Sequence, residues 1–62
     1  MSRTTTYVIT EWDGTEEVVE VLEGPVPEME MGSDDVRILY SNGTCHEVKR
    51  GYFNQLKPMP VQ

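Results

Sequence analysis

The only cysteine and the only histidine of the chain, Cys45 and His46, are neighbours within the stretch YSNGTCHEV at residues 40–48. A cysteine nucleophile needs an imidazole within hydrogen-bond reach of its sulfur. The composition here predicts a β-strand, and successive side chains of a strand point to opposite faces. The strand therefore separates the thiol from the imidazole. We expect Cys45 to fill space beside Leu39 and His46 to be structural.

Other patterns that could support chemistry are also better explained by structure. Asn42-Gly43-Thr44 matches the acceptor pattern for N-glycosylation, but a turn accounts for these three residues. One cysteine excludes an internal disulfide, and one cysteine with one histidine excludes the common Cys/His zinc sites. The sequence has no phosphate-binding glycine motif and no recognisable acid/base pair of carboxylates. We therefore expect a protein that is not an enzyme, with no catalytic residues, cofactor or metal.

Length and charge limit the remaining possibilities. The chain has 62 residues and a net charge of -6, and we treat residues 1–62 as one small β domain. A chain of this size buries only about 60% of the surface of its unfolded form, so self-association or a partner would help to complete its core. No apolar run is long enough to span a membrane. Nothing near the first residue resembles a signal peptide, which favours a cytoplasmic protein.

The charge is unevenly distributed along the chain. Residues 1–35 carry ten acidic side chains against Arg3, whereas residues 36–62 carry four basic side chains against Glu47. The acidic half favours a partner with a basic surface and disfavours direct binding of nucleic acid. The alternative is that the acidic residues only keep the protein soluble. A patch for nucleic acid could be formed by Tyr52 with the four basic residues Arg37, Lys49, Arg50 and Lys57, but the net negative charge of the chain disfavours it.

The elements that must position these side chains begin with a hairpin. Strands are predicted from Thr5 to Trp12 and from Thr15 to Leu22, with Asp13-Gly14 as a two-residue turn. This turn sets Val8 opposite Val19, and we prefer it. A three-residue loop would instead set Ile9 opposite Glu17 and mix apolar and charged residues on each face.

A second hairpin is predicted from strands at residues 36–40 and 44–49. Here a three-residue loop, Ser41-Asn42-Gly43, is preferred, because it places apolar residues on one face and opposes Arg37 to Glu47. Gly43 would be left-handed and form a bulge. The expected pairs are Tyr40/Thr44, Leu39/Cys45, Ile38/His46, Arg37/Glu47 and Val36/Val48. The two hairpins resemble each other when Trp12 is aligned with Tyr40.

The remaining segments are short or irregular. Residues 1–4 are expected to be a loose leader, and residues 23–35 a long acidic loop rich in proline and methionine. An extended piece of that loop would place Met29 and Met31 on one side. A helical turn is expected at Tyr52, Phe53 and Leu56, followed by a tail at 58–62 that can form a short fifth strand. The expected core is Val8, Val19, Val21, Val36, Ile38, Val48, Phe53 and Leu56.

Two hairpins, a long loop, a helical turn and a possible last strand predict an all-β protein. Their order resembles that of a small SH3-like barrel, in which a single helical turn commonly precedes the last strand. The alternative is an open four-stranded sheet with one face covered by a partner or by a second copy. Fold alone does not establish function.

The leading functional hypothesis is a protein–protein interaction module whose acidic face binds a basic surface of a partner, such as a surface that normally binds nucleic acid. In size and charge the chain is similar to small inhibitors from phages and mobile elements, such as anti-CRISPR proteins, which would act in the host cytoplasm. The alternatives are an SH3-like module that binds a basic or methylated peptide through Trp12, Tyr40 and the long loop, and a structural subunit that completes its core by assembly as a homo-oligomer. The candidate partner-binding residues are Trp12, Glu16, Glu17, Glu28, Met29, Glu30 and Met31.

Overall fold

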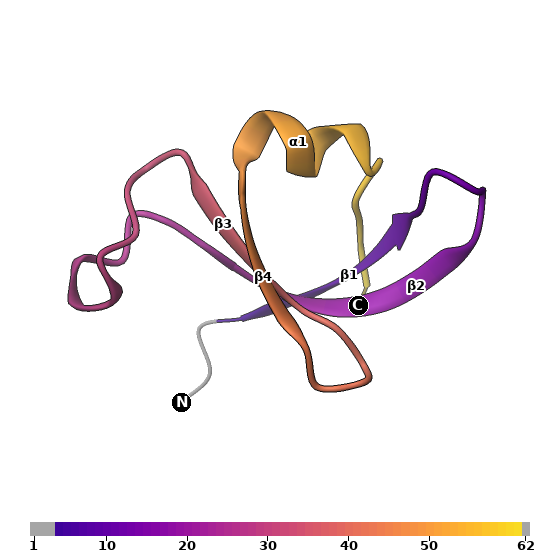
Figure 1. Cartoon of the computed structure of the whole chain (residues 1–62), viewed down its shortest axis with the longest axis horizontal. Helices are drawn as coiled ribbons and strands as arrows, with labels where there is room; N and C mark the ends of the chain where they lie inside the picture. The colour runs from indigo at the N-terminus through magenta and orange to yellow at the C-terminus, as the bar shows by residue number, and fades with distance from the viewer. Residues whose placement is uncertain (1–3, 62) are drawn as a thin grey trace.

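The computed structural model describes residues 4–61, so most of the expected leader at 1–4 lies outside the described residues. Five antiparallel strands form one sheet in the order β4-β3-β2-β1-β5 (Figure 1). A 3₁₀ turn, η1, interrupts the long loop, and the helix α1 precedes the last strand. The elements are β1 (Thr5–Thr10), β2 (Glu16–Glu23), η1 (Pro27–Met29), β3 (Asp35–Leu39), β4 (Cys45–Lys49), α1 (Arg50–Gln55) and β5 (Met59–Pro60).

The all-β prediction is confirmed, and so is the helical turn before a short last strand. Closure into a barrel is not confirmed, because β4 and β5 lie at opposite edges of one open sheet. Helix α1 lies across one face of this sheet, which we call the inner face (Figure 1). In the described part of the chain, no helix is long and apolar enough to cross a membrane.

The second hairpin has the predicted register. Arg37 lies opposite Glu47 and Leu39 opposite Cys45, and Val36 lies opposite Val48. Gly43 has a φ of 92°, as expected for the left-handed residue of a bulge. The pattern decided this register correctly because only one alignment puts the apolar residues on a common face.

The first hairpin has the other register, so the prediction of a two-residue turn is wrong. Ile9 lies opposite Glu17, and Val8 lies opposite Val18 rather than Val19. The loop is Trp12-Asp13-Gly14, closed by a hydrogen bond of 2.7 Å from the Glu11 N–H to the Thr15 carbonyl. Ile9 therefore points to the inner face and is fully buried, whereas Val8, which was expected in the core, is only half-buried on the outer face.

The two hairpin loops have the same geometry. In each loop the glycine N–H donates to the carbonyl three residues earlier, from Gly14 to Glu11 over 2.9 Å and from Gly43 to Tyr40 over 3.0 Å. Both glycines are left-handed, with φ of 88° and 92°. The structural equivalent of Trp12 is therefore Ser41, not Tyr40. The similarity noticed in the sequence is real but shifted by one residue.

The core lies between the inner face of the sheet and α1. Phe53 and Leu56 of the helical segment pack on five strand residues, and the partly buried Tyr7, Tyr40 and Val48 pack against this cluster. The rings of Tyr7 and Phe53 meet edge to face at 5.4 Å. The buried residues of this cluster are Ile9, Val19, Val21, Val36, Ile38, Phe53 and Leu56.

The long loop carries a small cluster of its own. Val26 pairs with Met31 across η1, and both pack with Leu22. Met31 is 3% exposed and Met29 is 44% exposed, so the expectation that both methionines lie on one side is wrong. The loop is not extended here, because Met29 ends η1 and the left-handed Glu30 that follows it turns the two side chains into different environments.

Candidate functional site

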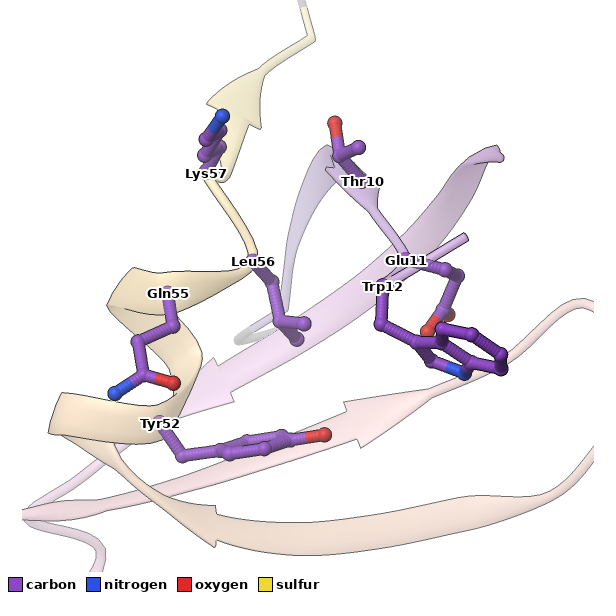
Figure 2. Close-up of a pocket in the computed structure, with 7 residues that line it drawn as sticks. All are labelled: Thr10, Glu11, Trp12, Tyr52, Gln55, Leu56 and Lys57. Atoms are coloured by element: carbon purple, nitrogen blue, oxygen red, sulfur yellow. The ribbon is translucent and has the colours of Figure 1, made fainter. Parts of the chain in front are cut away.

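A groove with a volume of about 310 Å³ opens between the tip of the first hairpin and the C-terminal end of α1 (Figure 2). We call it the Trp12–Tyr52 groove after its two aromatic walls. A hydrogen bond of 2.8 Å from the Thr10 N–H to the Leu56 carbonyl joins the two sides, and Leu56 lies between them. The lining residues are Thr10, Glu11, Trp12, Tyr52, Gln55, Leu56 and Lys57.

Both aromatic walls are accessible. Trp12 is 95% exposed and Tyr52 is 53% exposed. Figure 2 shows the tyrosine ring extending from α1 toward the indole, with the Glu11 carboxylate close to the indole. Aromatic rings presented to solvent beside a carboxylate form an environment that attracts cations, through the ring faces and through charge. The groove can therefore accept a cationic group.

Further aromatic and acidic side chains extend this environment along the inner face. Burial raises the pKa of the Tyr40 hydroxyl, and the nearby Glu11, Tyr52 and Glu17 raise it further. These three neighbours raise the pKa because negative charge close to a phenol disfavours its ionisation. Tyr40 also meets His46 edge to face, with ring centroids 5.4 Å apart. The end of the inner face next to the groove is thus both aromatic and acidic.

Lys57 forms the opposite end of the groove from Trp12 (Figure 2). Its φ is 53°, in the left-handed region, and its N–H donates to the Asn54 carbonyl over 3.2 Å. Glycine is the usual residue at this position after a helix, and another residue there costs about 1–2 kcal/mol. Lys57 is exposed, and no carboxylate among residues 4–61 lies within ion-pair distance of it.

The other described cations are neutralised by ion pairs. Glu47 pairs with Arg37 at 3.0 Å on the outer face. Lys49 reaches Asp35 at 2.7 Å, and its hydrogen bond is the main cause of the lowered pKa of that carboxyl. The basic patch considered from the sequence is therefore largely compensated by neighbouring carboxylates.

Arg50 belongs to a third pair, at the end of the inner face remote from the groove. Its guanidinium donates to Glu23 over 2.5 Å, and the Tyr7 hydroxyl donates to the same carboxylate over 3.1 Å. The hydrogen bond from Arg50 is the main reason that the pKa of Glu23 lies below its usual value, and burial opposes this shift. This cluster fixes the start of α1 to β2, and it was not foreseen from the sequence.

The structure divides the predicted partner-binding residues into two groups. Trp12, Glu16 and Glu17 lie at the first hairpin, whereas Glu28 and Glu30 lie on the long loop at the opposite end of the sheet (Figure 1). They do not form one continuous face.

Both methionines of the predicted partner-binding set lie on the long loop. Met31 is buried, so its proposed role as an anchor for a partner is wrong. Met29 remains exposed.

Cys45 and His46 lie on opposite faces of β4, as the strand prediction required. Cys45 pairs with the half-exposed Leu39 on the outer face, and His46 pairs with the buried Ile38. Cys45 is exposed rather than a buried filler. Among residues 4–61, no three His, Cys, Asp or Glu side chains are grouped so that they could hold a metal ion.

The sequence did not identify Tyr52, Gln55 and Lys57 as companions of Trp12, from which they are some 40 positions distant. The available signal was the helical spacing of Phe53 and Leu56, which buries those two residues and turns Tyr52 outward. Comparison with protein-family models, curated proteins and solved structures finds no match to this chain.

Proposed function

We propose that this protein is a binding module for a cationic segment of a partner protein, and that the Trp12–Tyr52 groove is its contact surface. The observation that carries the proposal is the 95% exposure of Trp12. The second hairpin builds the same loop with Ser41 in that position, so the fold does not require an indole there. A large aromatic side chain that the fold does not need, beside a groove, is typical of a binding residue.

The chemistry of the groove favours a lysine or arginine side chain. A cation between the Trp12 and Tyr52 rings gains about 0.5–2 kcal/mol from their faces. Glu11 and Glu17 add charge attraction, and no cation among the described residues is paired with either carboxylate. A methylated lysine would keep its charge and would fit the same aromatic environment.

The topology is compatible with an SH3-like arrangement, which we retain as part of the proposal. β1 pairs with both β2 and β5, and the helical turn comes directly before β5. In such folds a sheet that curls on itself presents its loops around one end. The hairpin tip and the end of α1 meet in this way at the groove.

A titration with a lysine-containing peptide tests the proposal. The probe is acetyl-Gly-Lys-Gly-Lys-Gly-amide, added to isotope-labelled protein and followed by amide chemical shifts. We expect Trp12→Ser to weaken binding about fivefold or more, because a cation–π contact is lost. The matched control is Leu39→Ser, which alters an exposed apolar residue on the outer face. Equal affinity of the wild type and Trp12→Ser would refute the proposal.

In a second candidate function, the broader acidic surface is the part of the protein that binds the partner. It is favoured by the ion pairs of Arg37, Lys49 and Arg50, which leave the surface field dominated by carboxylates. Such a surface could occupy the phosphate-binding site of a partner, as in a phage-encoded inhibitor of host machinery. The partner would have to reach both ends of a molecule 34 Å long.

The two acidic groups can be neutralised separately to test this candidate. Glu16→Gln with Glu17→Gln alters the hairpin, and Glu28→Gln with Glu30→Gln alters the long loop. Each double variant should lose the partners that the wild type captures from the native host. High salt should also weaken capture by the wild type, because it screens these charges. Retention of all partners by the quadruple variant would exclude an acidic mimic.

A further inference from the structure

Lys57 occupies a position where the backbone favours glycine. Its φ of 53° is left-handed, and it precedes Pro58, which disfavours helical conformations of the residue before it. A glycine would relieve this strain. Strained residues that persist in a fold are concentrated at functional sites. The lysine side chain therefore carries a conformational cost, as Glu30 does on the long loop at a φ of 58°.

The Lys57 ammonium also differs from the other described cations in its surroundings. Arg37, Lys49 and Arg50 each donate to a carboxylate at 3.0 Å or less. Within residues 4–61 Lys57 has no such pair, and it lines the groove at the end away from Glu11 (Figure 2). Among the described residues, the groove is thus lined by one unpaired carboxylate, Glu11, and one unpaired ammonium, Lys57, and Figure 2 shows the ammonium pointing away from the two aromatic rings.

We infer that Lys57 is an anion-binding residue of the groove, and that the ligand segment carries an aspartate or glutamate close to its lysine or arginine. This inference rests on the proposed function and specifies its ligand. The ligand cation would lie between Trp12 and Tyr52 near Glu11, and the ligand carboxylate would contact Lys57. A segment with cations alone would place a like charge beside Lys57 and would bind less well.

The test compares two series of peptides that differ by one charge. The first is acetyl-Gly-Lys-(Gly)n-Glu-Gly-amide with n from zero to two, and the second has glutamine in place of glutamate. The range of n covers different separations of the two charges, because each extended residue adds about 3.3 Å. Affinities are measured by amide chemical shifts at low salt, since exposed ion pairs are screened.

For the wild type we expect a preference of about two- to fivefold for the best glutamate peptide over its glutamine counterpart, as for an exposed ion pair. Lys57→Gln removes the charge, and Lys57→Gly removes the side chain and the strain. Both variants should abolish the preference and should bind the glutamine peptide somewhat more tightly than the wild type does, because the like charge beside the ligand lysine is removed. Lys57→Gly should also raise the melting temperature, which shows that the loss is not caused by unfolding.

Glu30→Gly supplies the matched control. Glu30 is the other described non-glycine residue with a left-handed φ, 58°, and it lies on the long loop away from the groove. This variant should also raise the melting temperature but keep the glutamate preference. A preference that survives Lys57→Gln, or wild-type binding without any preference, would overturn the role of Lys57 alone. Absence of binding to both series would overturn the proposed function as well.

Discussion

Asp13 and Asn42 play the same part in two different hairpins. Each side-chain Oδ1 accepts a hydrogen bond of 3.0 Å from the N–H two residues later, from Thr15 in the first hairpin and from Thr44 in the second. In the first hairpin this bond is the main cause of the lowered pKa of Asp13. Each bond supports a three-residue loop that ends in a left-handed glycine. The chain therefore uses one loop geometry twice, with different residues in the first two positions.

Because the two hairpin loops have the same geometry, substitution of their glycines should destabilise the fold by the same amount. A Cβ at Gly14 or Gly43 would meet no atom within 4 Å, so only the left-handed backbone opposes alanine there. We expect Gly14→Ala and Gly43→Ala each to lower the free energy of unfolding by about 1–2 kcal/mol. The control is Gly51→Ala, also in open space but helical, which should be neutral or stabilising. Urea unfolding measures all three, and unequal losses at Gly14 and Gly43 would contradict the equivalence of the loops.

The register of the first hairpin can be tested at two adjacent residues. Ile9 is fully buried and Val8 is half-buried on the other face. We expect Ile9→Val to cost about 1 kcal/mol, and Ile9→Thr to cost at least about 2 kcal/mol because it buries a hydroxyl. Val8→Thr keeps the branched shape and should cost less than about 0.5 kcal/mol. Thermal unfolding measures these losses of stability. A larger loss from Val8→Thr than from Ile9→Thr would indicate that the two-residue turn is correct.

Substitutions of the two methionines of the long loop should also differ in their effect on stability. Met31 packs with Leu22 and Val26, whereas Met29 is largely in water. We expect Met31→Ala to destabilise the fold by about 2 kcal/mol or more and Met29→Ala by less than about 0.5 kcal/mol. Chemical denaturation of the two variants provides the measurement. A larger loss from Met29→Ala would show that the loop packs differently.

The Glu23 cluster predicts a dependence of stability on pH. The pKa of Glu23 is lowered in the folded state, chiefly by the hydrogen bond from Arg50. The unfolded chain then binds the proton more readily, so this contribution is complete above the ordinary pKa of about 4.3 and is lost as pH falls through the folded value. We expect Glu23→Gln to reduce the rise in stability that occurs as the pH increases toward about 4.3.

Glu16→Gln is the control for that experiment. Glu16 is exposed and pairs with no cation among the described residues, so this change should leave the slope of stability against pH as in the wild type. Melting temperatures at half-unit steps of pH would reveal the difference. Equal slopes for the wild type and Glu23→Gln would show that the cluster does not stabilise the folded state.

The two hairpins show what a sequence pattern can and cannot decide. In the second hairpin only one register opposes Arg37 to Glu47 and also collects the apolar residues on one face, so the prediction was correct. In the first, adjacent valines and isoleucine supply apolar residues to both faces, and either register buries some of them. The Asp13-Gly14 pair then favoured a two-residue turn, although the Asp13 side chain stabilises the longer loop.

The groove was less accessible to prediction than the strands. Trp12 was selected from the sequence as a binding residue, but its companions Tyr52 and Lys57 come from the far end of the chain. Their position depends on how Phe53 and Leu56 seat α1 on the sheet, which is a matter of three-dimensional packing rather than of local pattern. Tyr40, the expected companion, instead packs at the edge of the core.

The strand order has a consequence for the sequence of folding events. Three pairings join strands that follow one another along the chain, whereas β5 must return to β1 from the other end. Closing so long a loop costs more chain entropy than closing a hairpin. We therefore expect the β1–β5 pairing to form last and open first. Exchange of the Val61 amide, which donates to Thr6 over 2.9 Å, should then be faster than that of the amides shared by β2 and β3.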